Sequence, residues 1–359
     1  MNLRGITIAA LLFAATLATA HAQTAPQPII IPLWPHATPE PPQTSDPEID
    51  TTKPTDALFN GKRSARLTNV TVPTLSVYSP LPGKDTHVAA LVFPGGGYVR
   101  LAWNGEGTDT CDWLNRIGVT CLLVKYRVPE QGHYPDNPAD LEDAQQAMRL
   151  ARQHAAEWHI NPDRIGVIGY SAGGNLAVLL STHPDDVHVL STPAAPDVPT
   201  VNGTPRRAAP AFAILGYPAY LAVPPAETSL DAVYTPNQFT PPTFLIQAEN
   251  DKGYGRNALV YYRALMDAHV PAELHYYATG GHGFGVDPPN APEQHWTHLA
   301  TAWLHSTGIL PSEPHHESGR PYTGLSTGPV QPCPLDTQQP PPAGRPIKPN
   351  PNNTDNPCP

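Results

Sequence analysis

Short apolar runs alternate along the middle of the chain with segments whose apolar residues recur every three to four positions. The runs predict buried strands at residues 75–78, 89–93, 121–126, 165–168, 212–215, 244–247 and 273–277. The periodic segments predict helices at residues 108–117, 139–158, 258–268 and 293–305, and another helix that begins near residue 175. This alternation predicts an α/β fold, in which helices cover both faces of a mostly parallel central sheet. Because ligands bind beyond the carboxyl ends of such strands, the loops that follow strands are candidates for chemistry.

The regions that flank this pattern lack it, and they divide the chain into four parts. Residues 1–22 combine Arg4, an apolar stretch and the small residues Ala20 and Ala22, which is typical of a cleaved secretory signal peptide. We predict an extended lead-in at residues 23–62, one compact domain at 63–310, and a Pro-rich, disordered tail at 311–359. The protein is therefore expected to be secreted or periplasmic, with no membrane attachment after cleavage.

Composition narrows the possible partners. Lys and Arg number 21 against 31 Asp and Glu, and a net charge of −10 argues against binding to nucleic acid. Four cysteines suit an oxidising compartment, but the sequence leaves open whether Cys111 pairs with Cys121, or Cys333 with Cys358. Neither a C-x-x-C nor an H-E-x-x-H motif is present, so we predict no metal site and no organic cofactor.

A Gly-rich turn follows the predicted strand at residues 165–168. Its sequence, Gly-Tyr-Ser-Ala-Gly-Gly at residues 169–174, places Ser171 between a strand and a helix. A turn this tight needs glycine, because side chains would collide across it, and the dipole of the following helix favours negative charge on the serine oxygen. We therefore predict that Ser171 is a nucleophile.

Two later strand ends supply an acid and a base. Asp251 follows the strand at 244–247, and His282 lies in a Gly-rich loop after the strand at 273–277. A nucleophilic serine needs a base, and the base needs an acid that orients it. Asp251 is favoured as that acid, while Glu249 at the same strand end remains an alternative. The chain order Ser, Asp, His is that of α/β-hydrolases.

The loop after the strand at 89–93 reads Pro-Gly-Gly-Gly-Tyr. We expect it to contribute to an oxyanion hole, the group of N–H donors that stabilises negative charge on the reacting carbonyl oxygen. The predicted donors are the main-chain N–H groups of Gly95, Gly96, Gly97 and Ala172. Aromatic side chains near these loops could stack on a sugar or an aryl group; the candidates are Tyr98, Trp103 and Tyr254.

Four of these segments together resemble a known group of enzymes. They are the Pro-Gly-Gly-Gly-Tyr loop, the turn around Ser171, the stretch PAELHYYATGGHGFG at 271–285 and IPLWP at 31–35. Over about residues 29–310 the chain resembles secreted α/β-hydrolases related to bacterial acetyl xylan and feruloyl esterases, and more distantly hormone-sensitive-lipase-like esterases. The resemblance implies a catalytic domain with the α/β-hydrolase fold and little or no lid. It also implies that the substrate is an acylated polysaccharide, cleaved by Ser171, Asp251 and His282.

Three alternatives share parts of this pattern. A general short-chain carboxylesterase would use the same catalytic residues, whereas a lipase would need a larger apolar lid. A peptidase of the prolyl-oligopeptidase type would need a propeller domain, for which the roughly 70 residues before the sheet are too few. A non-catalytic polysaccharide-binding protein would not need an intact set of serine, acid and histidine. The acyl group, the sugar and the oligomeric state stay open.

Overall fold

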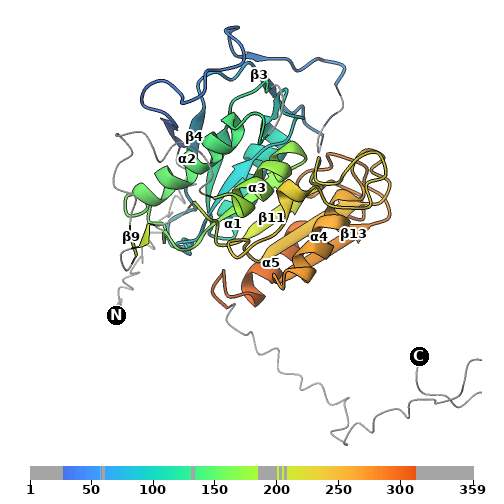
Figure 1. Ribbon diagram of the computed structural model, residues 1–359. Helices are drawn as coiled ribbons and strands as arrows, with labels where there is room; N and C mark the ends of the chain where they lie inside the picture. Colours follow the sequence, from blue (N-terminus) through green and yellow to red (C-terminus); the bar gives the residue numbers. More distant parts are fainter. Residues whose placement is uncertain are drawn as a thin grey trace, which may run out of the picture. The chain divides into compact units, whose positions relative to one another are not determined.

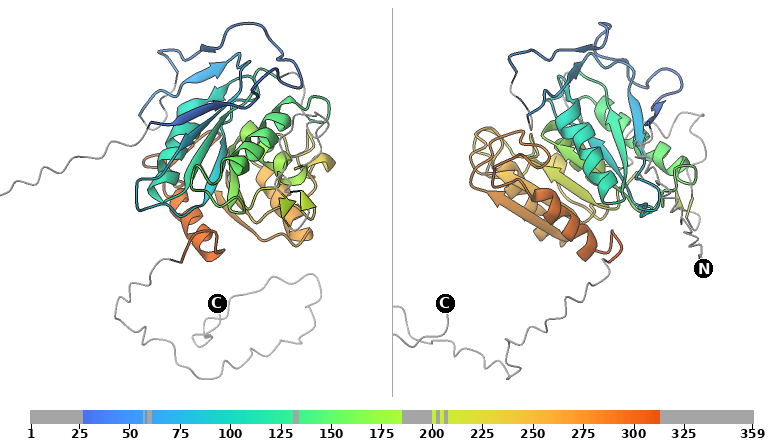
Figure 2. Two further views of the ribbon diagram at one scale, coloured as in Figure 1. Left: turned by 90° about the vertical axis from the view of Figure 1, so that its left-hand side faces the viewer. Right: turned by 180° about the vertical axis from the view of Figure 1, so that it is seen from behind.

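An eight-stranded sheet runs through the structure and carries helices on both faces (Figures 1 and 2). Across the sheet the strands are, in order, β1 (Ile29–Pro32), β4 (Thr74–Tyr78), β7 (Thr120–Lys125), β5 (Ala89–Phe93), β8 (Ile165–Tyr170), β11 (Ala213–Gly216), β12 (Thr243–Ala248) and β13 (Ala272–Tyr277). Strand β4 is antiparallel to both of its neighbours, and all other pairs are parallel. The predicted mostly parallel sheet is thereby confirmed.

This computed structural model describes residues 27–56, 58, 61–130, 134–184, 200–201, 204–205 and 208–312. The predicted signal peptide and tail, with Cys333 and Cys358, lie outside the described residues, apart from the tail's first two positions, 311 and 312. Within the described part of the chain, no helix is long and apolar enough to cross a membrane.

The helices divide between the two faces of the sheet. One face packs against α1 (Asp109–Arg116) and α5 (Trp296–Ser306), and the other against α2 (Ala139–Gln153), α3 (Ala172–Thr182) and α4 (Asn257–Asp267). Side chains of a strand point alternately to the two faces. In β5, Leu91 and Phe93 accordingly join the core beneath α2 and α3, whereas Ala90 and Val92 join the core beneath α1 and α5.

The N-terminal lead-in contributes strands of its own. Strand β1 is the edge of the main sheet, and β2 (Ile49–Asp50) pairs with β3 (Arg66–Thr68), which in turn pairs with β6 (Leu101–Ala102). Between β1 and β2, the Trp34 indole donates to Asp143 Oδ1 at 2.7 Å. This segment is therefore held by hydrogen bonds to the rest of the fold.

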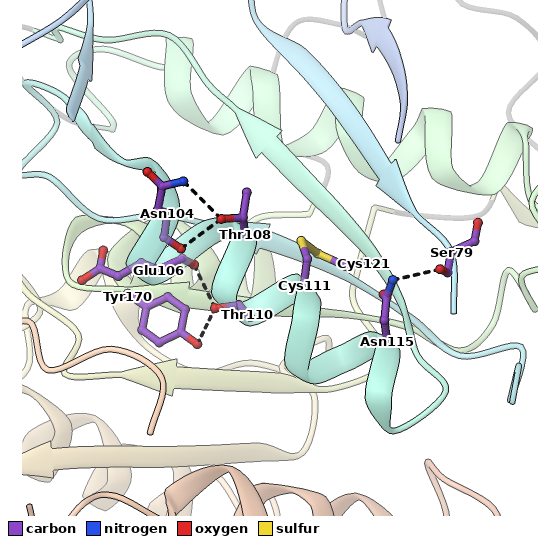
Figure 3. The surroundings of a disulfide bond; sticks show 9 residues. All are labelled: Ser79, Asn104, Glu106, Thr108, Thr110, Cys111, Asn115, Cys121 and Tyr170. Atoms are coloured by element: carbon purple, nitrogen blue, oxygen red, sulfur yellow. Dashed lines mark hydrogen bonds between the residues drawn. A yellow bond between two sulfur atoms is a disulfide. The ribbon is translucent and has the colours of Figure 1, made fainter. Parts of the chain in front are cut away.

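The connection from β6 to β7 contains the helix predicted at 108–117, which the structure has as α1, and before it an element that the sequence does not predict. The structure has a π-helix, η1 (Trp103–Thr108), which leads into α1 without a side-chain cap. Cys111 of α1 and Cys121 of β7 form a disulfide, with Cα atoms 5.1 Å apart (Figure 3). Among the described residues there are also the short elements β9 (Thr200–Val201), β10 (Thr204–Pro205) and the 3₁₀-helix η3 (Ala232–Tyr234).

Candidate active site

Ser171 lies at the turn between β8 and α3, as the sequence predicts. Its φ of 53° and ψ of −119° are unusual for a residue with a side chain and are typical of strained functional positions. The turn is also crowded. A Cβ on Gly169 would lie 2.1 Å from the carbonyl oxygen of Gly173, and one on Gly173 would lie 2.1 Å from that of Phe93. Both glycines are therefore required by close approach of the main chain.

Ser171, His282 and Asp251 are joined by two short hydrogen bonds. Ser171 Oγ lies 2.7 Å from His282 Nε2, and His282 Nδ1 lies 2.6 Å from Asp251 Oδ2. Because an ionised carboxylate only accepts, the Nδ1 atom carries the proton and Nε2 accepts from the serine hydroxyl. The arrangement allows His282 to remove the proton of Ser171.

Asp251 is buried beneath the more exposed His282. The exposed fraction of its side chain is 2 %, against 31 % for His282. Its carboxylate also accepts from Gln247 Nε2 at 3.0 Å and from the main-chain N–H groups of Gly253 and Tyr254 at 3.2 and 3.1 Å. Burial acts to raise the pKa of Asp251, but the hydrogen bond and charge of His282 and the hydrogen bonds from Gln247 and Tyr254 together lower it. Asp251 is therefore suited to remain ionised beside the histidine.

Glu249, the alternative acid, is exposed at the end of β12. Its main-chain N–H donates to the carbonyl of Tyr277, while the carboxylate that contacts His282 is that of Asp251. The geometry therefore favours Asp251.

Two peptide groups after β5 have a fixed orientation. The carbonyl of Gly95 accepts from Ala102 N–H at 2.9 Å, and that of Gly96 accepts from the N–H groups of Val99 and Arg100 at 3.2 and 3.3 Å. In a trans peptide the N–H points opposite to the carbonyl. The N–H groups of Gly96 and Gly97 thus face away from the segment 99–102.

The predicted oxyanion hole needs one correction. The N–H of Gly95 already donates to Glu106 Oε2 at 2.7 Å, so it is not free to bind an oxyanion. Ala172 is the first residue of α3, where an N–H has no acceptor within the helix. The donors that fit the geometry are Gly96, Gly97 and Ala172.

Of the three candidate substrate contacts, Tyr98 is excluded by burial. Its side chain is 0 % exposed, and its hydroxyl donates to Asn175 Oδ1 at 2.8 Å, so it belongs to the core. Trp103 is half-buried at the start of η1 and packs against both core clusters. Tyr254 is half-buried with its ring centroid 5.0 Å from that of His282, and it alone of the three flanks the histidine.

Two residues beside the site were not selected from the sequence. Glu106 of η1 is buried and accepts from Gly95, and Tyr217 after β11 donates to Glu106 Oε1 at 2.9 Å. The Tyr217 ring centroid lies 5.3 Å from that of His282. Neither belongs to a motif, and an acid within a segment rich in glycine is ordinarily solvated, so the sequence carries no signal for them.

Comparison with known proteins agrees with the fold. Residues 90–286, more than half of the chain, match a family described as alpha/beta hydrolase fold. The chain is 30% identical over 213 residues to an acetylxylan esterase of Xylanibacter ruminicola, covering 57% of this chain and 42% of that protein. It is 25% identical over 209 residues to endo-1,4-beta-xylanase B of Butyrivibrio fibrisolvens, covering 55% and 32%. The chain thus spans less than half the length of these two relatives.

Among solved structures, an acetyl ester-xyloside bifunctional hydrolase from Caldicellulosiruptor lactoaceticus superposes with a TM-score of 0.59. It is 29% identical, and the match covers 80% of this chain and 100% of that one. The sheet order and the strand–serine–helix turn described above agree with the family match. The chain therefore belongs to the family with the α/β-hydrolase fold.

Proposed function

We propose that this protein is a serine carboxylic-ester hydrolase that removes acyl groups, acetyl in particular, from plant-type polysaccharides or oligosaccharides. The observation that carries the proposal is the pair of hydrogen bonds that joins Ser171 Oγ through His282 to Asp251. The substrate class rests on the similarity to a protein named acetylxylan esterase and to a structure titled acetyl ester-xyloside bifunctional hydrolase.

In the acylation step, His282 Nε2 takes the proton of Ser171 as Oγ attacks the ester carbonyl. The negative charge that develops on the carbonyl oxygen is stabilised by the N–H groups of Gly96, Gly97 and Ala172. Buried Asp251 keeps the Nδ1 proton in place and stabilises the imidazolium. His282 then gives its proton to the leaving sugar hydroxyl, which leaves an acyl group on Ser171.

In the second step, water replaces the sugar. His282 removes a proton from the water as it attacks the acyl carbonyl, and then returns that proton to Ser171 Oγ, which releases the acid. No further group is needed for proton balance.

Cleavage of glycosidic bonds is not part of the proposal. That chemistry needs two carboxyl groups that flank the bond, one of which acts as an acid. In the part of the chain that the structure describes, the buried carboxylates beside Ser171 are engaged, Asp251 with His282 and Glu106 with Gly95 and Tyr217.

A general short-chain carboxylesterase is the second candidate. The half-buried aromatic ring of Tyr254 flanks His282, and such a wall suits a small acyl or aryl group as well as a sugar. Only the leaving alcohol separates the two candidates.

The experiment compares acetate release from acetylated xylan with hydrolysis of p-nitrophenyl acetate and butyrate. Ser171→Ala should abolish all three activities, whereas Ser181→Ala, which removes a buried hydroxyl in the same helix, should retain them. Strong release from xylan supports a polysaccharide deacetylase, and activity on the small esters alone favours the carboxylesterase. A wild-type protein inactive on every ester would refute both.

We also propose that the protein is secreted or periplasmic, which rests on the pattern of residues 1–22. Expression of the full chain followed by mass spectrometry of the exported protein tests this. The mature N-terminus is expected at Gln23, and a protein that stays in the cytoplasm with residues 1–22 intact would contradict it.

A further inference from the structure

Glu106 is a carboxylate beside the reacting serine to which the mechanism above gives no role. Its side chain is 4 % exposed, within the π-helix η1. Burying an ionisable group is costly, and an apolar residue of similar volume is often as stable or more so. π-Helical turns are also frequent at functional sites. Its contacts therefore need an explanation other than packing.

One oxygen of Glu106 holds the first peptide group of the oxyanion loop. Oε2 accepts from Gly95 N–H at 2.7 Å, while the carbonyl on the other side of that peptide, that of Pro94, accepts from the Tyr126 hydroxyl at 2.6 Å. The next carbonyl, that of Gly95, accepts from Ala102 N–H at 2.9 Å. The loop thus enters the oxyanion hole with both peptide planes fixed.

The other oxygen of Glu106 reaches the loop that carries the base. Oε1 accepts from the Tyr217 hydroxyl at 2.9 Å, and the oxygen of that hydroxyl accepts from Gly285 N–H at 2.9 Å. Gly285 lies three residues after His282, whose ring packs against the edge of Tyr217. One side chain therefore connects the oxyanion loop to the histidine loop.

The space around this connection is tight. A Cβ on Gly95 would lie 2.8 Å from Glu106 Oε2 and 2.7 Å from Ser171 Cβ. Burial raises the pKa of Glu106, against the lowering effect of its bonds with Tyr217 and Gly95 and the charge of His282. Because Gly95 is packed between Glu106 and Ser171, a displacement of the Glu106 side chain would be transmitted through Gly95 to the turn that carries Ser171.

We propose that Glu106 is a positioning residue: its two hydrogen bonds hold the Gly95 and Gly285 main chains, so that the oxyanion donors and His282 keep their places about Ser171. This rests on the proposed function. A residue of this kind affects the transition state, in which the oxyanion forms, more than the binding of the ground-state ester.

The test compares Glu106→Leu, which removes both acceptors, with Glu106→Gln, which keeps an oxygen for Gly95 N–H and an amide for the Tyr217 oxygen. Thr110→Val is the matched control. The Thr110 hydroxyl lies 3.0 Å from the main-chain carbonyl oxygen of Glu106 and 3.0 Å from the Tyr170 hydroxyl (Figure 3). This variant therefore disturbs the same buried region but leaves the hydrogen bonds of the Glu106 carboxylate in place. Steady-state kinetics on p-nitrophenyl acetate and inhibition by a trifluoromethyl ketone are measured for each, with thermal unfolding as the check on folding.

We expect Glu106→Leu to lower kcat about 100-fold, with KM within threefold of the wild-type value. Inhibition by the ketone should weaken in proportion to the loss in kcat/KM. Glu106→Gln should recover kcat to within about tenfold of wild type, and Thr110→Val should leave it within threefold. If Glu106→Leu does not fold, Tyr217→Phe replaces it, with an expected loss of about tenfold in kcat.

Three results would overturn the inference: Glu106→Leu, or Tyr217→Phe in its place, with kcat within threefold of wild type; Glu106→Gln as impaired as Glu106→Leu; or Thr110→Val equally impaired. A wild-type protein that cleaves no ester and binds no ketone would instead refute the proposed function, so the two failures are distinguishable.

Discussion

Asp251→Asn is the substitution whose effect the geometry defines most closely. Asp251 Oδ1 accepts from the main-chain N–H groups of Gly253 and Tyr254, which cannot become acceptors. The amide of an asparagine must therefore keep its oxygen there and turn its NH₂ group toward His282 and Gln247. Gln247 can adapt by rotating its own amide, because its Oε1 is buried and has no hydrogen-bond partner among the described residues.

His282 can adapt only by changing its tautomer. Facing an NH₂ group, Nδ1 must accept, so the ring proton moves to Nε2, which lies 2.7 Å from Ser171 Oγ. In that form His282 cannot take the serine proton. Substitutions of this kind in a Ser-His-Asp triad cost about 10⁴ in kcat, which corresponds to about 5 kcal/mol of transition-state stabilisation. The free energy of unfolding should change little, because each neighbour of residue 251 keeps a partner.

The test measures kcat for hydrolysis of p-nitrophenyl acetate, and urea unfolding of the same preparations gives the free energy of unfolding. Glu249→Gln is the control, since it removes the exposed carboxylate at the same strand end and should leave kcat near the wild-type value. A folded Asp251→Asn protein that keeps more than about a tenth of wild-type kcat would refute the tautomer argument. A large loss in Glu249→Gln would show that the acid had been misassigned.

Three further predictions concern the fold. Gly173→Ala should lower the free energy of unfolding by about 3 kcal/mol or more, because its Cβ would meet the main-chain oxygen of Phe93; an unchanged urea midpoint would contradict this. Replacing Cys111 and Cys121 by Ala should cost about 3 kcal/mol from loop-closure entropy and remove any effect of reductant on Tm. Burial raises the pKa of Asp140 to about 7, so the folded state binds more protons than the unfolded state and loses stability as pH rises from about 4 to 7. The Tm of Asp140→Asn relative to that of the wild-type protein should therefore be higher at pH 8 than at pH 5. The same Tm difference at both pH values would contradict this prediction.

The buried strands of the sheet could be predicted because each is a continuous apolar run. The predicted strand at 89–93 coincides with β5, and that at 165–168 lies within β8. Strand β1 was missed since its residues are mostly exposed and it is specified by pairing with β4, more than forty residues later. The π-helix η1 has no periodic pattern of apolar residues, so its local sequence does not predict a helix.

In the site, the sequence predicts the residues that directly follow strands, but it does not predict Glu106 and Tyr217, which support them. Position at a strand end selected Ser171, Asp251 and His282, and the structure brings them within hydrogen-bond distance. Whether an N–H faces outward depends instead on peptide orientation, which at Gly95 is set by a side chain eleven residues later. Tyr98 failed as a substrate contact for a similar reason, because a loop sequence does not show which way an aromatic ring turns.

The order of strands in the sheet explains why Tyr217 matters. The base follows β13, which is three places from β8, the strand that carries the nucleophile. At about 4.8 Å per strand, His282 must reach back roughly 14 Å across the sheet edge. Four glycines with positive φ in the loop at 280–285 allow that path, and Asn250 Oδ1 accepts from Gly281 N–H at its start.

Tyr217 follows β11, one of the two strands that separate β8 from β13. Its ring packs in a T-shaped arrangement against that of His282, and its hydroxyl contacts Gly285 at the end of the returning loop and Glu106 near the oxyanion loop. Tyr217 therefore contacts the returning loop at two points, through its ring at His282 and through its hydroxyl at Gly285. A histidine carried this far from its strand depends on such a support, because the glycines that permit the path do not by themselves select it.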